Sequence, residues 1–294
     1  MSVVLLATVL LSVVIGLSLG LLGGGGSILT VPILTYVAGL DAKEAIAASL
    51  FVVGVTSAVS AIDHARKGRV KWRTGLIFGA AGMAGAFGGG LLGGHIPGTI
   101  LMIAFALMMV ATSIAMIRGR KNKTTATTHD GELPIVKVIV EGLIVGLVTG
   151  LVGAGGGFLV VPALALLGGL SMPIAVGTSL VVIAMKSFAG LAGYLTTVTL
   201  DWGLVAAVTA AAVLGSLIGS RLAGRIPEAA LRKGFGIFVL VMGVFVLVQE
   251  LPTPWGTALA ATAGILAVAA AACWFLLPRC PLRTPLNRRT AEAH

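Results

Sequence analysis

The chain has 294 residues, of which 57% are hydrophobic and only 10% charged. Soluble domains carry about a quarter charged residues, so the composition predicts an all-α integral membrane protein and excludes a sizeable soluble domain. The formal net charge is +10, but the basic residues form short clusters between hydrophobic runs, at 66–73, 118–123, 221–233 and 279–289. That distribution is typical of cytoplasmic loops. It indicates a lipid bilayer as partner and argues against nucleic-acid binding.

In chain order, the hydrophobic runs predict seven full membrane spans, because about 20 apolar residues cross a hydrocarbon layer of roughly 30 Å. The spans are expected at 45–62, 74–93, 99–117, 174–197, 203–222, 231–250 and 256–277. Two further apolar regions, 3–38 and 136–168, each contain a glycine cluster followed by a proline and a short apolar run. Glycine clusters break helices, and proline suits the first helical turn. Each region is therefore expected to form a broken or re-entrant hairpin.

The two hairpin regions carry the same phrase. Residues 20–34 read GLLGGGGSILTVPIL, and residues 150–164 read GLVGAGGGFLVVPAL. The same offset relates Trp72 to Trp202 and Pro97 to Pro227. We therefore divide the chain into a first transmembrane repeat, a polar cytoplasmic linker, a second repeat, and an extra span with a basic cytoplasmic tail, at 1–117, 118–135, 136–250 and 251–294.

The basic clusters test this topology. If each hairpin returns to its starting side, all of the basic clusters fall on the cytoplasmic side, as the positive-inside rule requires. The loop 39–44 then lies outside and its equivalent 169–173 inside, so the two repeats are expected to be inverted. The N-terminal run lacks a preceding Lys or Arg, so we expect it to be retained. The N-terminus is then outside and the C-terminus cytoplasmic.

The glycine clusters are the first candidate site. Irregular backbone at membrane depth must be buried in protein or line a cavity, and its free N–H groups can hold an anion. The alternative is that the glycines only allow close helix packing. Two clusters at equivalent positions favour a substrate site formed by Gly23, Gly24, Gly25, Gly26, Ser27, Gly153, Gly155, Gly156 and Gly157.

A polar stripe is the second candidate, since its members recur on one helical face in both repeats. The alternative is that these hydroxyls bond their own helix or a neighbouring one. Lys186 stands out because a charge in mid-membrane is functional by default, and its equivalent is Thr56. An anionic substrate would neutralise it; otherwise it reaches an interface or pairs with a carboxylate from another span. The predicted members are Ser49, Thr56, Ser57, Thr178, Ser179, Lys186 and Ser187.

Other chemistry finds little support in the sequence. There is no Cys/His cluster with metal-ligand spacing, no phosphate-binding loop and no paired catalytic carboxylates, so we expect no metal, no cofactor and no catalytic residue. Glu141 is the one weak candidate for a proton-carrying carboxylate, and it can equally pair with Lys137 one turn away. Glycine series at 85–93 and 215–223 favour close helix packing, either between the repeats or in a homodimer.

With these motifs the chain resembles the TauE/SafE family of bacterial membrane proteins, sulfite or organosulfonate exporters. The resemblance rests on the two glycine phrases and on the run 176–190, VGTSLVVIAMKSFAG, and covers nearly all of 1–250. It implies a sulfur-containing anion as substrate. At position 186 the family would be expected to carry a polar residue such as Asn, so Lys186 is a departure that could mark altered anion selectivity.

The sequence thus predicts a secondary transporter, an exporter, of a small sulfur oxyanion such as sulfite or a short organosulfonate. It would work by alternating access in the bacterial inner membrane. The alternatives are an importer, a carrier of another small anion, or an anion channel; an intramembrane enzyme ranks low. A coupling ion, proton or sodium, is left open.

Overall fold

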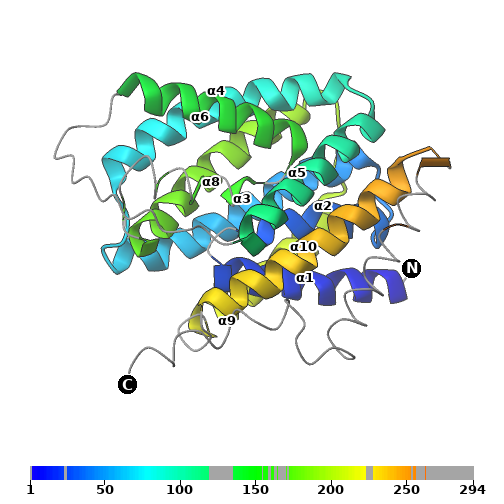
Figure 1. The fold of residues 1–294 in the computed structure, drawn as a ribbon, viewed down its shortest axis with the longest axis horizontal. Coiled ribbons are helices and arrows are strands. Elements are labelled where there is room, and N and C mark those ends of the chain that lie inside the picture. The colour runs from blue at the N-terminus through cyan, green and yellow to red at the C-terminus, as the bar shows by residue number, and fades with distance from the viewer. Residues whose placement is uncertain are drawn as a thin grey trace.

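The computed structural model describes residues 2–22, 25–118, 135–153, 155–157, 160, 161, 164, 170, 172–222, 228–252, 254, 255 and 262. Within these residues the chain is helical and contains no strand (Figure 1). The elements are α1 (Ser2–Leu22), the 3-10 helix η1 (Gly25–Leu29), α2 (Thr30–Tyr36), α3 (Ala42–Arg66), α4 (Trp72–His95), α5 (Gly98–Arg118), α6 (Ile135–Val152), α8 (Met172–Tyr194), α9 (Trp202–Leu222) and α10 (Glu228–Glu250). Gly23, Gly24, most of the predicted linker and the predicted span 256–277 lie outside the described residues.

Local chemistry accounts for the boundaries of α3 and α4. Asp41 precedes α3 in an extended conformation, and Glu44 lies in the first turn, where a negative charge suits the helix dipole. At the other end, Gly68 adopts a φ of +67°, which ends the helix in a tight turn. α4 ends at His95, two residues before Pro97, a residue that cannot continue a helix.

The order of helices repeats along the chain. Adding 130 to the residue numbers of α1, α3, α4 and α5 gives the positions of α6, α8, α9 and α10, within a few residues at each end. The packing repeats as well. α4 packs on α6 and α8, while its counterpart α9 packs on α1 and α3; α3 packs on α8, and α5 on α10. Each contact is thus matched when the two halves are exchanged, as expected for a pseudo-two-fold arrangement.

The equivalent helices α3 and α8 run in opposite directions. Along their contact, a methyl group added at Gly177 would lie 3.2 Å from His64 Cβ, and one at Gly54 would lie 3.2 Å from the Phe188 ring. Further along, a methyl at Gly190 would lie 3.4 Å from Leu50 Cδ1. Along the contact, residue numbers therefore decrease in α3 as they increase in α8, so the two helices are antiparallel.

Glycines bring the two halves into backbone contact. A methyl group at Gly85 or Gly89 of α4 would overlap the carbonyl oxygens of Leu143 and Leu147 in α6. The related pair is Gly215 and Gly219 of α9, which lie against α1 in the same way. These are the two glycine series noted in the sequence. They allow the repeats to pack closely against each other, as small residues do between membrane helices.

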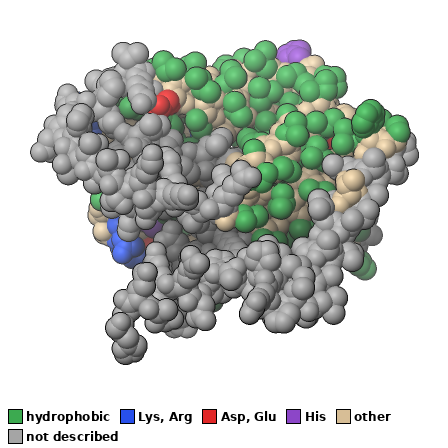
Figure 2. All heavy atoms as spheres, in the orientation of Figure 1, with side chains coloured by type: hydrophobic (Ala, Val, Ile, Leu, Met, Phe, Trp, Pro, Cys, Tyr) green, Lys and Arg blue, Asp and Glu red, His purple; other side chains and the backbone are tan. Residues whose placement is uncertain are grey.

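Five helices are long and apolar enough to cross a membrane: α1, α3, α4, α8 and α9. In the other two predicted spans within the described residues, the apolar helical segments are shorter, Gly98–Ile114 and Gly236–Glu250. Figure 2 shows mostly hydrophobic side chains on the coloured part of the surface, and exposed examples include Phe87 of α4 and Leu107 of α5. The outside of the molecule therefore suits lipid.

The first glycine region has unequal arms. α1 is a continuous helix of 21 residues, long enough to cross, whereas the return consists of η1 with 5 residues and α2 with 7. A methyl group at Gly20, late in α1, would lie 2.7 Å from the backbone nitrogen of Ser220, late in α9. By contrast, Leu40 lines a pocket with Asp201, just before α9 begins. Between residues 20 and 40 the chain has therefore returned from the end of α9 to the level at which α9 begins.

Candidate functional site

Lys186 lies in the middle of α8 and is 1% exposed. Its ammonium Nζ donates a hydrogen bond of 2.9 Å to Thr149 Oγ1 of α6. Its aliphatic stem passes Gly82 of α4, where an added methyl group would lie 3.8 Å from Lys186 Cβ. The charged group is therefore enclosed by protein and does not reach an interface, which rules out one of the two alternatives left open by the sequence.

The other alternative, a pairing of Lys186 with a carboxylate from another span, is not seen among the described residues either. Lys67 forms an ion pair with Asp63, and in the described part of the chain no Asp or Glu lies within salt-bridge distance of Lys186. Glu141 is in α6 with Thr149, but eight residues earlier, roughly 12 Å along the helix at 1.5 Å per residue. Lys186 is therefore a buried amine without a protein counter-charge among the described residues.

Thr149 is a partner that the sequence analysis missed. Its hydroxyl donates to Val145 O at 2.7 Å and lies 3.2 Å from Gly146 O, so its proton is committed to its own helix. The oxygen therefore accepts from Lys186. The sequence contained a signal for it. Thr149 is equivalent to Leu19 and Lys186 to Thr56, so two residues that differ between the repeats contact each other.

The second glycine cluster forms a tight turn beside this ammonium. Gly153, Gly155 and Gly156 have φ values of 72°, 59° and 64°, a left-handed conformation that favours glycine. A methyl group at Gly156 would overlap both Lys186 Nζ and Thr149 Cγ2. The turn can approach the ammonium only because it has no side chain at this position.

The same turn touches the first repeat. Ser49 Oγ of α3 donates a hydrogen bond of 2.9 Å to Gly153 O. A methyl group at Gly155 would lie 3.3 Å from Ser27 Oγ, so the middle of η1 reaches the second glycine cluster. Ser27, Ser49, Gly153, Gly155, Gly156 and Lys186, all predicted from the sequence, therefore come together between α3, α6 and α8.

Several buried polar groups of the molecule lack a partner among the described residues. The hydroxyl oxygens of Ser57, Ser187 and Thr30 are buried without a hydrogen bond. No described residue accepts a hydrogen bond from the N–H groups of Gly155 and Gly156. Unpaired buried polar groups are rare and call for an explanation, and a bound polar ligand provides one.

Other predicted residues are engaged elsewhere. Thr56 Oγ1 donates to Val52 O at 2.7 Å, and Ser179 Oγ donates to Val176 O at 2.8 Å, so both bond their own helix. Thr178 Oγ1 accepts a 3.0 Å hydrogen bond from the Lys71 backbone N–H. Gly25 and Gly26 are in η1, and Gly157 starts a helical turn. No group of His, Cys, Asp and Glu able to hold a metal occurs in the parts of the chain that are described.

The two ends of the repeat interface differ. Where α3 begins and α8 ends there is a pocket of about 610 Å³. Its polar lining residues are Thr35, Asp41, Lys43, Glu44, Thr99, Thr197, Thr199 and Glu250. A second pocket of about 220 Å³ shares Leu40, Glu44 and Thr199 with it. Lys186 lines neither pocket.

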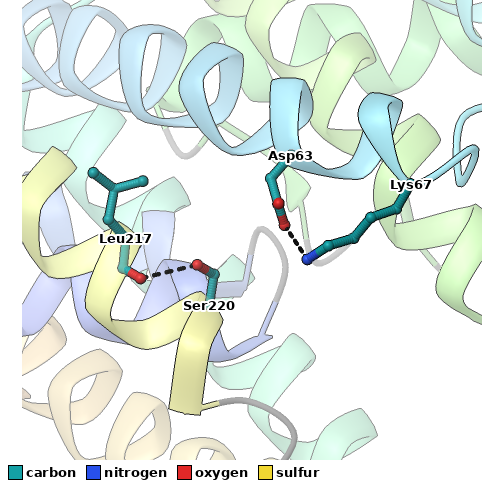
Figure 3. A network of polar contacts seen from close by, with 4 residues as sticks. All are labelled: Asp63, Lys67, Leu217 and Ser220. Atoms are coloured by element: carbon teal, nitrogen blue, oxygen red, sulfur yellow. Dashed lines mark hydrogen bonds and ion pairs between the residues drawn. The ribbon is translucent and has the colours of Figure 1, made fainter.

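At the opposite end the connection between α3 and α4 closes over α8. Lys71 is tied to Thr178 by the hydrogen bond above, and a methyl group at Gly177 would overlap Arg69 O. Figure 3 shows this end, where Lys67 Nζ lies 2.6 Å from Asp63 Oδ2 and Ser220 Oγ donates to Leu217 O at 3.0 Å. The equivalents of Gly177 and Thr178 are Ala47 and Ala48, so the first repeat lacks this hydroxyl acceptor.

Comparison with known proteins agrees with this architecture. The model of the family described as Sulfite exporter TauE/SafE matches residues 8–246. The chain belongs to this family. A resemblance first seen in the glycine phrases is thereby confirmed over both repeats of the TauE/SafE chain.

Curated TauE/SafE relatives are described as probable membrane transporter proteins. One from Xylella fastidiosa is 34% identical over 237 residues, covering 79% of this chain and 91% of its own. YdhB of Bacillus subtilis is 25% identical over 247 residues, covering 81% and 98%, and one from Methanocaldococcus jannaschii is 29% identical over 260 residues, covering 81% and 94%. No solved structure matches significantly. The chain is a multi-pass membrane transporter and not an enzyme.

Proposed function

We propose that this transporter carries a small oxyanion, such as sulfite or a short organosulfonate, across the bacterial inner membrane by alternating access, with Lys186 as the counter-charge. The observation that carries the proposal is the Lys186 ammonium, 1% exposed and, among the described residues, hydrogen-bonded only to a neutral hydroxyl. Removing an unpaired ammonium from water costs several kcal/mol. An anion beside it offsets that cost.

The unpaired donors of the interior suit an oxyanion. The N–H groups of Gly155 and Gly156 and the hydroxyls of Ser57, Ser187 and Thr30 have no protein acceptor among the described residues. The substrate would use those donors that face it, together with the two remaining N–H bonds of the ammonium. The family description supports sulfite as the substrate and export as the direction. Import, or another small anion, fits the same donors.

Alternating access is supported by the relation between the repeats. Antiparallel α3 and α8 are what inverted repeats produce, and inverted repeats commonly place the substrate at their interface near the midplane. The ends of this interface are unequal, one with a pocket of about 610 Å³ and the other covered by the 67–71 connection. In the predicted topology the pocket is on the outside and the covered end is cytoplasmic, while Lys186 does not line that pocket and is enclosed by protein.

Flux of radiolabelled sulfite into proteoliposomes tests the proposal. Wild type should show saturable uptake and counterflow, and Lys186→Met should abolish both. Lys67→Met is the matched control, because Lys67 is an exposed lysine in the α3–α4 turn. Equal flux in wild type and Lys186→Met would remove the proposed role of Lys186. Flux that rises linearly with concentration, without counterflow, would indicate a channel.

A further inference from the structure

We infer that Lys186 carries a proton together with the anion, so that the transporter couples oxyanion movement to proton movement in the same direction. This inference rests on the proposed function, because the anion is what stabilises the protonated form. It concerns a second ligand of the same site, the proton. It starts from the fact that the amine of Lys186 is 1% exposed and that no described residue supplies a counter-charge to it.

The charged groups on the neighbouring helices are all remote from Lys186. On α6, Glu141 is two turns from Thr149, and the other charge, Lys137, is farther. On α4, Arg73 and His95 lie near opposite helix ends, roughly 14 Å and 20 Å along the axis from Gly82, which contacts the lysine stem. The charged and titratable residues of α3 are Lys43, Glu44, Asp63, His64 and Arg66. They lie near its two ends, and at the His64 end the contact is with Gly177, nine residues from Lys186.

The second hairpin adds no ionisable side chain, since residues 153–171 contain none. The group that decides the state of Lys186 is therefore the ligand. With an anion bound, the ammonium is neutralised. Without one, a buried lysine releases its proton, because a neutral amine is far cheaper to bury than an isolated cation.

The hydrogen bond between Lys186 and Thr149 can form whether the lysine is protonated or neutral. Thr149 donates its own proton to Val145 O, so its oxygen remains an acceptor for an N–H of Lys186 whether the group is –NH₂ or –NH₃⁺. The position of the nitrogen is thus fixed while its charge changes. The balance is –NH₂ plus H⁺ plus X⁻ giving –NH₃⁺·X⁻, so the empty and loaded sites have the same net charge when X⁻ is singly charged.

Two consequences follow for transport. A singly charged sulfonate should move without net charge, so membrane potential should have no effect on it. Each unit of pH difference should support about a tenfold accumulation of the anion on the more alkaline side. Export into a more acidic exterior then requires an outward anion gradient larger than the inward proton gradient.

The test uses the full chain in proteoliposomes with radiolabelled methanesulfonate and an internal pH-sensitive dye. Wild type should accumulate the anion about tenfold for one pH unit, acid outside, and take up one proton per anion. A protonophore that collapses the gradient should remove the accumulation. Lys186→Arg keeps a permanent positive charge, so it should retain anion exchange but lose accumulation driven by the pH gradient. Gly88→Ala, where an added methyl group meets nothing within 4 Å, should behave as wild type.

Accumulation by Lys186→Arg equal to that of wild type would overturn proton carriage by Lys186 while leaving anion transport intact. Anion movement by wild type without proton uptake would do the same, and this measurement decides the matter if Lys186→Arg does not fold. If wild type neither exchanges nor accumulates methanesulfonate or sulfite, the proposed function itself fails.

Discussion

Lys186 Nζ donates to Thr149 Oγ1 at 2.9 Å, and both residues depart from their counterparts in the first repeat, Thr56 and Leu19. The fold tolerates an uncharged pair at the equivalent place, so the charge and its hydroxyl partner are an addition made only in the second repeat. The asymmetry of the site thus lies in two residues that touch each other.

Removing the Thr149 hydroxyl should weaken anion binding. In Thr149→Val the ammonium loses its fixed acceptor, and an unsatisfied buried donor costs about 1–3 kcal/mol, which corresponds to roughly 5- to 100-fold in affinity for sulfite. Thr149→Ser should stay near wild type. Thr112→Val is the control, because Thr112 makes the same bond to its own helix in α5, at 2.8 Å to Met108 O. Equal sulfite affinity in Thr149→Val and wild type would contradict a positioning role.

Adding a methyl group to the glycine turn should disrupt the site. Gly156→Ala introduces a side chain at a φ of 64° and overlaps Lys186 Nζ, so we expect a loss of about 1–3 kcal/mol of stability together with loss of transport. Gly88→Ala, on α4, meets nothing within 4 Å and should leave both unchanged. Thermal unfolding in detergent and sulfite flux measure the two effects. A fully active Gly156→Ala protein would show that the turn does not form the site.

The closed end should loosen when its contacts are removed. Gly177→Ala would overlap Arg69 O, and Thr178→Val removes the acceptor of the Lys71 N–H. Hydrogen exchange of the segment 67–71 should become at least about fivefold faster in both variants, since losing one hydrogen bond is worth about 1 kcal/mol. Gly234→Ala, which meets nothing within 4 Å, is the control. Unchanged exchange in both variants would argue against a gate here.

The inverted topology predicts opposite accessibility for the two ends of α3. With Cys273 and Cys280 replaced by Ser, Asp41→Cys should react with a membrane-impermeant thiol reagent from outside the cell. Lys67→Cys should react only after the membrane is opened. Asp41 and Lys67 are both exposed, so burial does not confuse the comparison. Equal labelling from outside would contradict the inverted arrangement.

The sequence predicted most helices, because apolar length and glycine or proline breaks have local causes. It also placed Lys186 in mid-span but left an interface position open, so the burial of Lys186 is a finding of the structure. It did not predict Thr149, whose role depends on how α6 packs against α8, a contact 37 residues apart in the chain. The sequence also did not predict that the two ends of the repeat interface differ. The role of Gly177 and Thr178 depends on their contacts with the 67–71 connection, which only the structure shows. The predicted span 256–277 remains a prediction.

Equilibrium binding of radiolabelled sulfite to purified protein tests the central claim most directly. Wild type should bind saturably, and Lys186→Met should lose roughly 150-fold or more in affinity, because removing one partner of a buried charge pair costs about 3 kcal/mol or more. Lys67→Met should bind as wild type does. The same affinity in wild type and Lys186→Met would contradict the account.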